Sequence, residues 1–409
     1  MQIVDRPPVH LTYSLNVHAG EGGDDQVRAI REVALEVRRQ VAPSRRFGLG
    51  LRLGRRAADE LAEGDRLAAL RALLDEHGLY VFTINGFPYG PFHGQPVKQN
   101  VYAPDWRTPE RMRYTCDLAD LLSELLPEGV EGSISTVPGS YKPWIRADGD
   151  VRAMTDNLAD CARHLADIET RTGRLVHLGL EPEPDCFVET TGEAIDFFET
   201  QLWSEGARRL SGQTGLGLSD ARDTLARHLG VCLDTCHLAL QFEDVTQSID
   251  RLRRAGVRIS KMQISAALKT VPTGDALARL KDFCDPVYLH QVKTQEGGVG
   301  AVRSLGDLEE ALEATHDATP SQPPSPWRIH CHVPLYFESD GPLESTATEL
   351  TPALFRKAIE AGVRHLEMET YTFNVLPETL RGRTLTESLV EEYRWVMGKV
   401  EPFEGFGSE

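Results

Sequence analysis

The strongest constraint on the fold of this 409-residue chain is a regular alternation of short apolar runs with longer stretches of helical period. This alternation is typical of βαβ units, in which helices connect parallel strands. The predicted strands are residues His10–His18, Phe47–Leu53, Leu79–Asn85, Glu131–Val137, Leu175–Glu181, Gly230–Asp234, Arg258–Ile264 and His365–Tyr371.

Amphipathic segments of helical length separate these strands. The predicted helices are residues Asp25–Val41, Ala57–His77, Pro109–Leu126, Val151–Thr172 and Pro352–Ala361. Gly78 and Gly362 follow two of them, at a position where glycine ends a helix with little strain. Eight strands, most of them followed by a helix, is the number that closes a barrel. We therefore expect an α/β fold, a single (β/α)₈ TIM barrel over residues 1–409, because such barrels tolerate long loops within one domain.

Two segments depart from the alternation. Residues Phe87–Trp106, rich in Gly, Pro and aromatic residues, follow the third strand and are predicted to cover the active-site face. Residues Ser265–Val363 contain two more strand-like runs, Val287–Val292 and Trp327–Phe337. We interpret this segment as an elaborated crossover between strands seven and eight, an insertion over about residues 266–363, since no repeat or low-complexity tract indicates an independent domain.

The charge balance limits the possible partners. Lys and Arg number 44 against 62 Asp and Glu, so the net charge of −18 repels nucleic acid. The first residues lack the cationic start and apolar run of a secretory signal, and no segment is long enough to cross a membrane. We expect a soluble, cytoplasmic protein without direct membrane insertion. The seven scattered cysteines form no CxxC pair and are predicted to be buried thiols.

Residues of metal-ligand type end the last four predicted strands: Glu181, Asp234, Gln263 and Glu369. The carboxyl ends of barrel strands meet at the active-site mouth. Carboxylate and amide oxygens are typical ligands of Mg²⁺ and Mn²⁺, and carboxylates also bind Zn²⁺. Buried carboxylates are costly unless they are paired or bound to a metal, so we predict one divalent metal here. The alternative is that each acid pairs with a nearby Arg or Lys.

Three histidines extend this prediction. His237 lies three residues after Asp234 and faces the same mouth if the strand turns directly into a helix, where it can position a substrate hydroxyl. His330 and His332 flank Cys331 in a strand-like run, which sends both imidazoles to one side. The three are a possible second metal site. The alternative is that His330 and His332 are hydrogen-bonded core residues.

We assign substrate contacts to His237, Asn85, His290 and Trp106. For His290 and Trp106 the alternative is a purely structural role in the packed interior. Glu183, in the turn after strand five, is either a supporting acid or a solvated loop charge. The chain has no GxGxxG after its first strand, no P-loop and no GxSxG, so dinucleotide-binding, nucleotide-hydrolysing and serine-hydrolase functions lack their motifs.

The motifs LGLEPEP, CLDTCH, KMQIS and LEMETY resemble the xylose-isomerase-like, or AP-endonuclease-2-like, TIM barrel superfamily, which includes sugar isomerases and epimerases. Over nearly the whole chain, the sequence is more closely similar to the EboE-type metabolite traffic proteins of that superfamily. The resemblance implies one metal held by Glu181, Asp234, Gln263 and Glu369. Strand seven usually offers His in this superfamily, so Gln263 favours Mn²⁺ or Mg²⁺ over Zn²⁺. His237 matches a histidine that contacts substrate or a second metal, and His330 and His332 match extra ligands.

The resemblance implies an isomerase or epimerase acting on a sugar, sugar phosphate or cyclitol. Glu181 and Glu369 are its predicted catalytic residues, which move a proton through a metal-stabilised enediolate. One alternative is a metabolite-binding or traffic protein on the same barrel without turnover. A second is a phosphodiesterase of the AP-endonuclease type, which the net charge of −18 disfavours.

Overall fold

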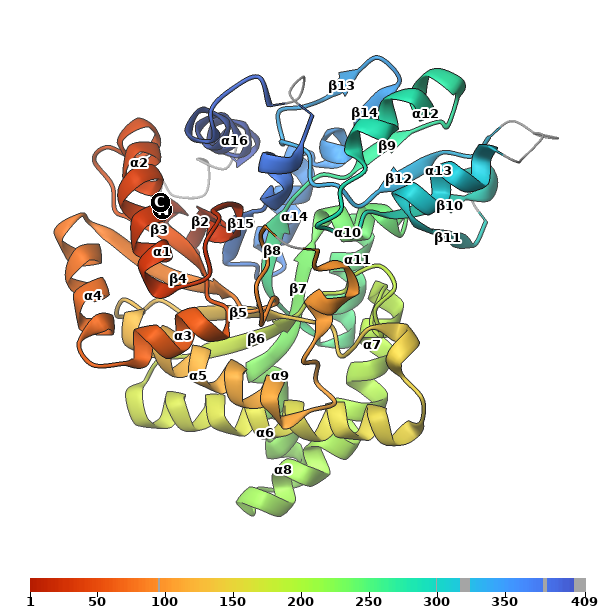
Figure 1. Ribbon diagram of the computed structural model, residues 1–409. Helices are drawn as coiled ribbons and strands as arrows, with labels where there is room; N and C mark the ends of the chain where they lie inside the picture. The colour runs from red at the N-terminus through yellow and green to blue at the C-terminus, as the bar shows by residue number, and fades with distance from the viewer. Residues whose placement is uncertain (95, 299, 317–323, 378–380, 401–409) are drawn as a thin grey trace.

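Eight parallel strands form the frame of the molecule in the computed structural model, which describes all residues except 95, 299, 317–323, 378–380 and 401–409 (Figure 1). They are β2 (Val9–Tyr13), β3 (Phe47–Arg52), β4 (Leu79–Asn85), β5 (Gly132–Thr136), β6 (Val176–Leu180), β7 (Leu229–Asp234), β8 (Arg258–Ile264) and β15 (His365–Met368). They pair in the order β2-β15-β8-β7-β6-β5-β4-β3, and a parallel bridge from Ser14 to Gly50 joins the two ends. The predicted (β/α)₈ barrel is confirmed. A short strand, β1 (Gln2–Val4), pairs antiparallel with β2.

Helices surround the strands on the outside (Figure 1). They are α1 (Gly23–Ala29), the π-helical turn η2 (Ile30–Ala34), α2 (Leu35–Val41), α3 (Arg55–Ala62), α4 (Arg66–Glu76), α5 (Pro109–Leu125), α6 (Asp148–Thr172), α7 (Thr191–Phe197), the π-helical η5 (Phe198–Gly206), α8 (Ala207–Thr214), α9 (Leu218–His228), α10 (Thr235–Leu240), α11 (Val245–Ala255), α14 (Pro352–Glu360) and α16 (Leu385–Val400). The predicted helix Ala57–His77 is two helices, α3 and α4. The chain breaks at Gly64, whose φ of 56° lies in the left-handed region that favours glycine.

The barrel strands are buried on both faces, because helices cover the outside and side chains fill the interior. Every residue of β3, β4, β5, β6 and β7 is buried. This explains why these strands appear in the sequence as continuous apolar runs rather than as an alternating pattern. Six of the seven cysteines are buried as well. No helix in the described ranges combines the length and the apolar character that a membrane span requires.

Between β8 and β15 the chain forms a second, antiparallel sheet beside the barrel, drawn from green-cyan to blue in Figure 1. Its strands are β9 (Leu268–Thr270), β10 (Gln291–Gln295), β11 (Val302–Asp307), β12 (Trp327–Ile329), β13 (Ser339–Asp340) and β14 (Leu343–Ser345), in the order β11-β10-β12-β9-β14-β13. The helices of this segment are α12 (Gly274–Leu280) and α13 (Leu308–His316). Lys293 of β10 anchors the sheet to the loop after β6, with its Nζ 2.7 Å from Asp185 and 2.6 Å from Glu189.

The strands of this second sheet differ from the predicted runs. β10 begins at Gln291 rather than at Val287, because the Asp285 carboxylate accepts hydrogen bonds from the amides of Val287 and Tyr288 in a local turn. β12 ends at Ile329, where the amide of Cys331 turns back to the Ile329 carbonyl. His330 and His332 therefore lie in the connection after the strand.

Candidate metal centre

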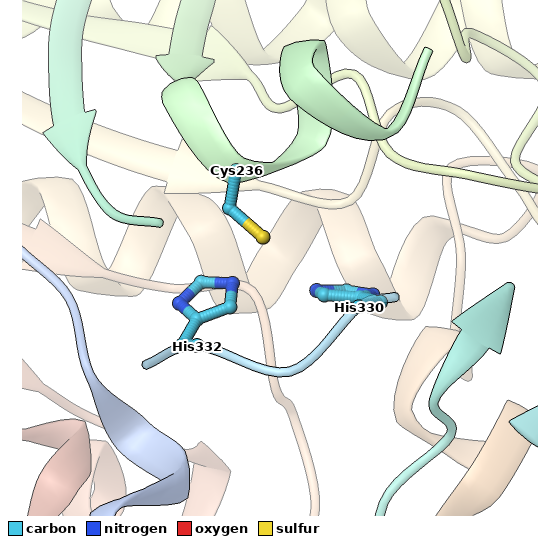
Figure 2. Close-up of side chains that lie close together, drawn as sticks. All are labelled: Cys236, His330 and His332. Carbon is cyan, nitrogen blue, oxygen red and sulfur yellow. The ribbon is translucent and has the colours of Figure 1, made fainter. Parts of the chain in front are cut away.

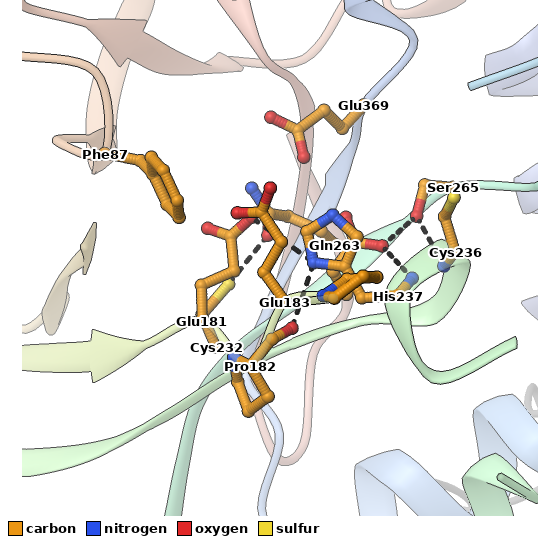
Figure 3. A network of polar contacts seen from close by, with 12 residues as sticks. Phe87, Glu181, Pro182, Glu183, Cys232, Cys236, His237, Gln263, Ser265 and Glu369 are labelled. Atoms are coloured by element: carbon orange, nitrogen blue, oxygen red, sulfur yellow. Dashed lines mark hydrogen bonds and ion pairs between the residues drawn. The ribbon is translucent and has the colours of Figure 1, made fainter. Parts of the chain in front are cut away.

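Three carboxylates meet at the carboxyl ends of the barrel strands and form what we call the strand-end cluster. Glu181 follows β6 directly, Asp234 is the last residue of β7, and Glu369 follows β15. One oxygen of each lies within 4.8 Å of the others, and all three side chains are buried. Figure 3 shows Glu181 and Glu369 with neighbouring residues and the polar contacts among them. Within the described part of the chain, no Lys or Arg forms an ion pair with any of the three.

The strand-end cluster has unsatisfied oxygens. Glu181 Oε2 and Asp234 Oδ2 are buried and lack a hydrogen-bond partner among the described residues. Asp234 Oδ1, in contrast, accepts hydrogen bonds from the His237 amide at 2.9 Å and the Ser265 hydroxyl at 2.7 Å. Unpaired buried carboxylate oxygens carry a desolvation cost of several kcal/mol that a bound cation removes. The residues present therefore fit a divalent metal.

Two amides hold Glu369 in place. Its Oε1 accepts hydrogen bonds from Nδ2 of Asn85 at 2.9 Å and from Nδ2 of Asn16 at 2.5 Å. Asn85 is the last residue of β4, and Asn16 follows β2, so both come from the same strand-end layer as the acid. Asn16 was not among the predicted site residues because it falls inside the predicted strand His10–His18, whereas β2 ends at Tyr13.

The pKa values of the cluster reflect its burial. Desolvation, together with the neighbouring carboxylates, raises the pKa of Glu181 and of Glu369 well above the usual range. Burial also acts to raise the pKa of Asp234. However, the imidazoles of His237 and His332 and the hydrogen bonds to its Oδ1 outweigh burial and hold that pKa below its usual value. A bound cation would lower the pKa of all three carboxyl groups and favour their anionic forms.

Gln263 lies beside Asp234, its partner in the register of β7 and β8, and is fully buried. Its Oε1 accepts a hydrogen bond from the Cys232 thiol at 2.9 Å, and its Nε2 has no partner among the described residues. Turning the amide over exchanges these two atoms, which places an oxygen where the unpartnered nitrogen lies. In that orientation Gln263 offers an oxygen ligand.

The three histidines of the predicted second site come together and form what we call the histidine group. Each ring uses Nδ1 for an acceptor oxygen: His237 for the Pro182 carbonyl at 3.0 Å, His332 for the Glu369 carbonyl at 2.8 Å and His330 for Gln291 Oε1 at 2.6 Å. Because these oxygens only accept, Nδ1 carries the proton in each ring and Nε2 carries a lone pair.

These lone pairs face one another. Nε2 of His237 lies 3.1 Å from Nε2 of His330, and Nε2 of His332 is buried without a partner in the described ranges. Burial lowers the pKa of all three imidazoles, to about 4 for His332, so they are neutral at pH 7. Two imidazoles on one tetrahedral Zn²⁺ have nitrogens about 3.4 Å apart, given Zn–N distances of about 2.1 Å. His237 and His330 come together with Glu183, and His330 and His332 come together with Cys236, with the ligand atoms of each set within 4.8 Å of one another. Either set fits a transition metal.

Cys236 is a fourth candidate ligand that the sequence analysis did not include. Figure 2 shows its thiol, on α10, between His330 and His332. Single ligand atoms of the three residues lie within 4.8 Å of one another, and all three are buried. Burial raises the pKa of the Cys236 thiol well above its usual value, so the thiol is neutral unless a metal displaces its proton.

Glu183 is part of the site, not a solvated loop charge. It is buried and accepts a hydrogen bond at 2.9 Å from the hydroxyl of Tyr102. Burial raises its pKa to about 8. A ligand oxygen of Glu183 lies within 4.8 Å of nitrogens of His237 and His330. The Phe87–Trp106 loop, which supplies Tyr102, therefore supports the site directly.

A pocket with a cavity volume of about 60 Å³, partly open to solvent, lies above these groups. Its polar lining includes Asn16, Asn85, Glu181, Glu183, His237, His330, His332 and Glu369. His290 and Trp106, two of the predicted substrate contacts, are not among the described residues that line it. His290 Nδ1 donates to the His330 carbonyl at 2.7 Å, and Trp106 is fully buried with its indole nitrogen donating to Thr136. The structure thus gives His290 and Trp106 supporting positions.

Comparisons with known proteins agree with this architecture. A family model described as Xylose isomerase-like TIM barrel matches residues 51–283. No curated protein matches the sequence.

Three solved structures align with nearly the whole chain. The probable 3-DHS dehydratase AsbF of Bacillus anthracis is 12% identical, with a TM-score of 0.46 over 94% of this chain and 98% of that one. A zinc-bound IOLI protein is also 12% identical, with a TM-score of 0.47 over 97% and 100% of the two chains. A D-tagatose 3-epimerase-like protein is 13% identical, with a TM-score of 0.40 over 95% and 98%.

Proposed function

The chain belongs to the xylose isomerase-like TIM barrel family, and from this premise we propose that it is a metal-dependent isomerase or epimerase. Its proposed substrate is a small sugar, sugar phosphate or cyclitol. The observation that carries the proposal is the strand-end cluster, three buried carboxylates with which no described Lys or Arg forms an ion pair. A bound cation would stabilise such a site, and the pocket above it has the mixed apolar and polar lining of a small-molecule site.

The proposed ligands of the first metal are Glu181, Asp234, Gln263 and Glu369. Their oxygens favour Mn²⁺ or Mg²⁺ over Zn²⁺. The proposed ligands of a second metal are His237, His330 and His332, and imidazole nitrogen favours Zn²⁺. The two sites share a wall, since the amide of His237 donates to Asp234.

A divalent ion bound at the strand-end cluster would polarise a carbonyl and a neighbouring hydroxyl of the substrate. Glu181 and Glu369 then act as the proton carriers. One of them accepts a proton from a substrate carbon. The same residue or the other one then returns a proton, to the adjacent carbon in an isomerase or to the opposite face of the same carbon in an epimerase. Asn16 and Asn85 occupy Oε1 of Glu369, so Oε2 is the oxygen that turns to the substrate or the cation.

Metal binding is the first test. Titration of the chelator-treated protein with Mn²⁺ and with Zn²⁺, followed by calorimetry and thermal unfolding, should show saturable binding and stabilisation. Glu369→Gln should weaken the binding of Mn²⁺ at least tenfold, because it removes a charged ligand. Glu392→Gln is the matched control: Glu392 is equally buried but bonds to Thr370 and the Leu335 amide outside the cluster. An absence of metal binding by the wild type would refute the proposal.

Turnover is the second test, and it separates an enzyme from a carrier. Incubation of metal-loaded protein with a panel of sugars, sugar phosphates and cyclitols in D₂O should exchange one carbon-bound proton of a substrate, as detected by NMR. A ligand that binds without exchange would instead support a metabolite-traffic role of the EboE type.

The histidine group favours a second candidate function, a metal-dependent phosphodiesterase of the AP-endonuclease type, because paired metals suit phosphoryl chemistry. The net charge of −18 and the carboxylate-rich pocket oppose a nucleic-acid substrate. Metal-dependent nicking of abasic-site DNA at physiological salt would favour the phosphodiesterase function over the isomerase function.

A further inference from the structure

The pocket has two chemically different parts. Its floor is lined by Glu181 and Glu369 of the strand-end cluster and by the histidine group, whereas Phe92, Tyr288 and Tyr371 line it as an aromatic wall. The ring centroids of these three residues lie 5.2 to 5.3 Å from one another. The wall adjoins the floor, because the ring of Tyr371 lies 4.7 Å from that of His332. A ligand that is bound at the floor and is large enough to reach beyond His332 would therefore contact the aromatic wall, beginning at Tyr371.

The aromatic wall is held in place by contacts behind it. The amide of Phe92 donates to Glu21 Oε1 at 2.8 Å, and Glu21 also binds Arg52 at 2.5 Å. The guanidinium of Arg52 lies over the Phe92 ring, 5.6 Å from its centroid. The hydroxyl of Tyr288 is hydrogen-bonded to His93 Nδ1 at 2.7 Å. A surface fixed in this way binds a flat or apolar group at a small entropic cost.

The cations near the pocket are already paired. Lys98 is the one Lys or Arg among the described lining residues. Its Nζ lies 2.6 Å from Asp307 and donates to the Asp285 carbonyl at 3.0 Å. A phosphate on the ligand would meet carboxylates on the floor without an unpaired cation to bind it, which is unfavourable.

We infer that the substrate joins an uncharged polyol or hydroxycarbonyl head group to an aromatic or other apolar substituent. The head binds at the strand-end cluster, and the substituent packs against Phe92, Tyr288 and Tyr371. Leu289, which is partly exposed, also lines the pocket. This inference rests on the proposed function, since the proposed metal binds the head group. It excludes sugar phosphates from the proposed substrates.

Three hydroxamates test the inference, because a hydroxamate chelates a divalent metal whatever the natural substrate is. The probes are acetohydroxamate, phenylacetohydroxamate and phosphonoacetohydroxamate, and calorimetry on the manganese-loaded protein measures their affinities. The phenyl substituent should increase affinity at least tenfold over acetohydroxamate, because it buries an aromatic ring. The phosphono substituent should give no increase.

Two variants locate the effect. Phe92→Ala and Leu289→Ala should each reduce the gain from the phenyl group by threefold or more, while the affinity for acetohydroxamate stays within twofold. Leu218→Ala, at a site that is 58% exposed and outside the pocket, is the control and should change neither affinity. If Phe92→Ala also loses acetohydroxamate, its fold is disturbed, and the half-exposed Leu289 decides the result.

The outcomes separate the two proposals. Failure of acetohydroxamate to bind the wild type would count against the metal site and hence the proposed function. Binding of acetohydroxamate with no gain from the phenyl group, or with tighter binding of the phosphono analogue, would overturn the inference about the substituent and leave the metal site intact.

Discussion

Two layers of buried acids lie inside the same barrel, and they differ in whether a lysine of the chain pairs with them. Glu367 of β15 forms an ion pair with Lys261 of β8 at 2.5 Å, and both side chains are 0% exposed. Glu369, two residues further on, points to the same side one layer higher and receives only the amides of Asn16 and Asn85. Lys261 thus forms an ion pair with the lower layer, whereas no described Lys or Arg forms one with the upper layer. Buried carboxylates without a cationic partner are costly, so the upper layer favours the binding of a cation from outside.

The largest expected effect comes from removing the internal cation. Lys261→Met leaves Glu367 buried and unpaired, which should lower the free energy of unfolding by about 3 to 5 kcal/mol. Denaturant unfolding measures the change. The double variant Lys261→Met/Glu367→Gln should recover much of the loss, because no charge then remains in that layer. If Lys261→Met is as stable as the wild type, the ion pair with Lys261 does not stabilise Glu367, and the contrast between the two layers is refuted.

Glu392 provides an intermediate case, a buried acid whose partners are a hydroxyl and an amide. Burial raises its pKa from 4.5 to about 7. The folded state therefore holds the proton more tightly than the unfolded state, and the stabilisation is complete below about pH 4.5. It should be lost progressively as the pH rises to about 7, on the order of 3 kcal/mol in total. Glu392→Gln should flatten this part of the stability profile, measured by unfolding at a series of pH values.

The smallest expected effect has the opposite sign. Glu181→Gln removes an acid that has no cationic partner, so in the presence of a chelator it should raise the free energy of unfolding by on the order of 1 kcal/mol at pH 8. Glu367→Gln is the matched variant in the lower layer and should be destabilising, because Lys261 loses its partner. If Glu181→Gln also destabilises the metal-free protein, Glu181 makes a stabilising interaction there, and the contrast between the two layers is refuted.

The site was only partly predictable from the sequence. The positions of Glu181, Asp234 and Glu369 follow from strand ends, because parallel barrel strands bring their carboxyl ends to one mouth. The different surroundings of Glu367 and Glu369 do not follow, because Lys261 is more than one hundred residues away from its partner in sequence. Likewise, Trp106 was predicted to contact substrate, but neither its position after a loop nor its residue type reveals that it is fully buried.

The sequence by itself determined the barrel and the kind of chemistry at its mouth, since both depend on local periodicity and on which residues end the strands. Only the tertiary structure decided how the imidazoles are oriented, because the carbonyls of Pro182 and Glu369 and the amide of Gln291 select the proton position on each ring. It also decided the position of the aromatic wall, whose three rings come from segments separated by up to 279 residues, Phe92 to Tyr371. Contacts of this range are set by packing, and no local pattern in the chain records them.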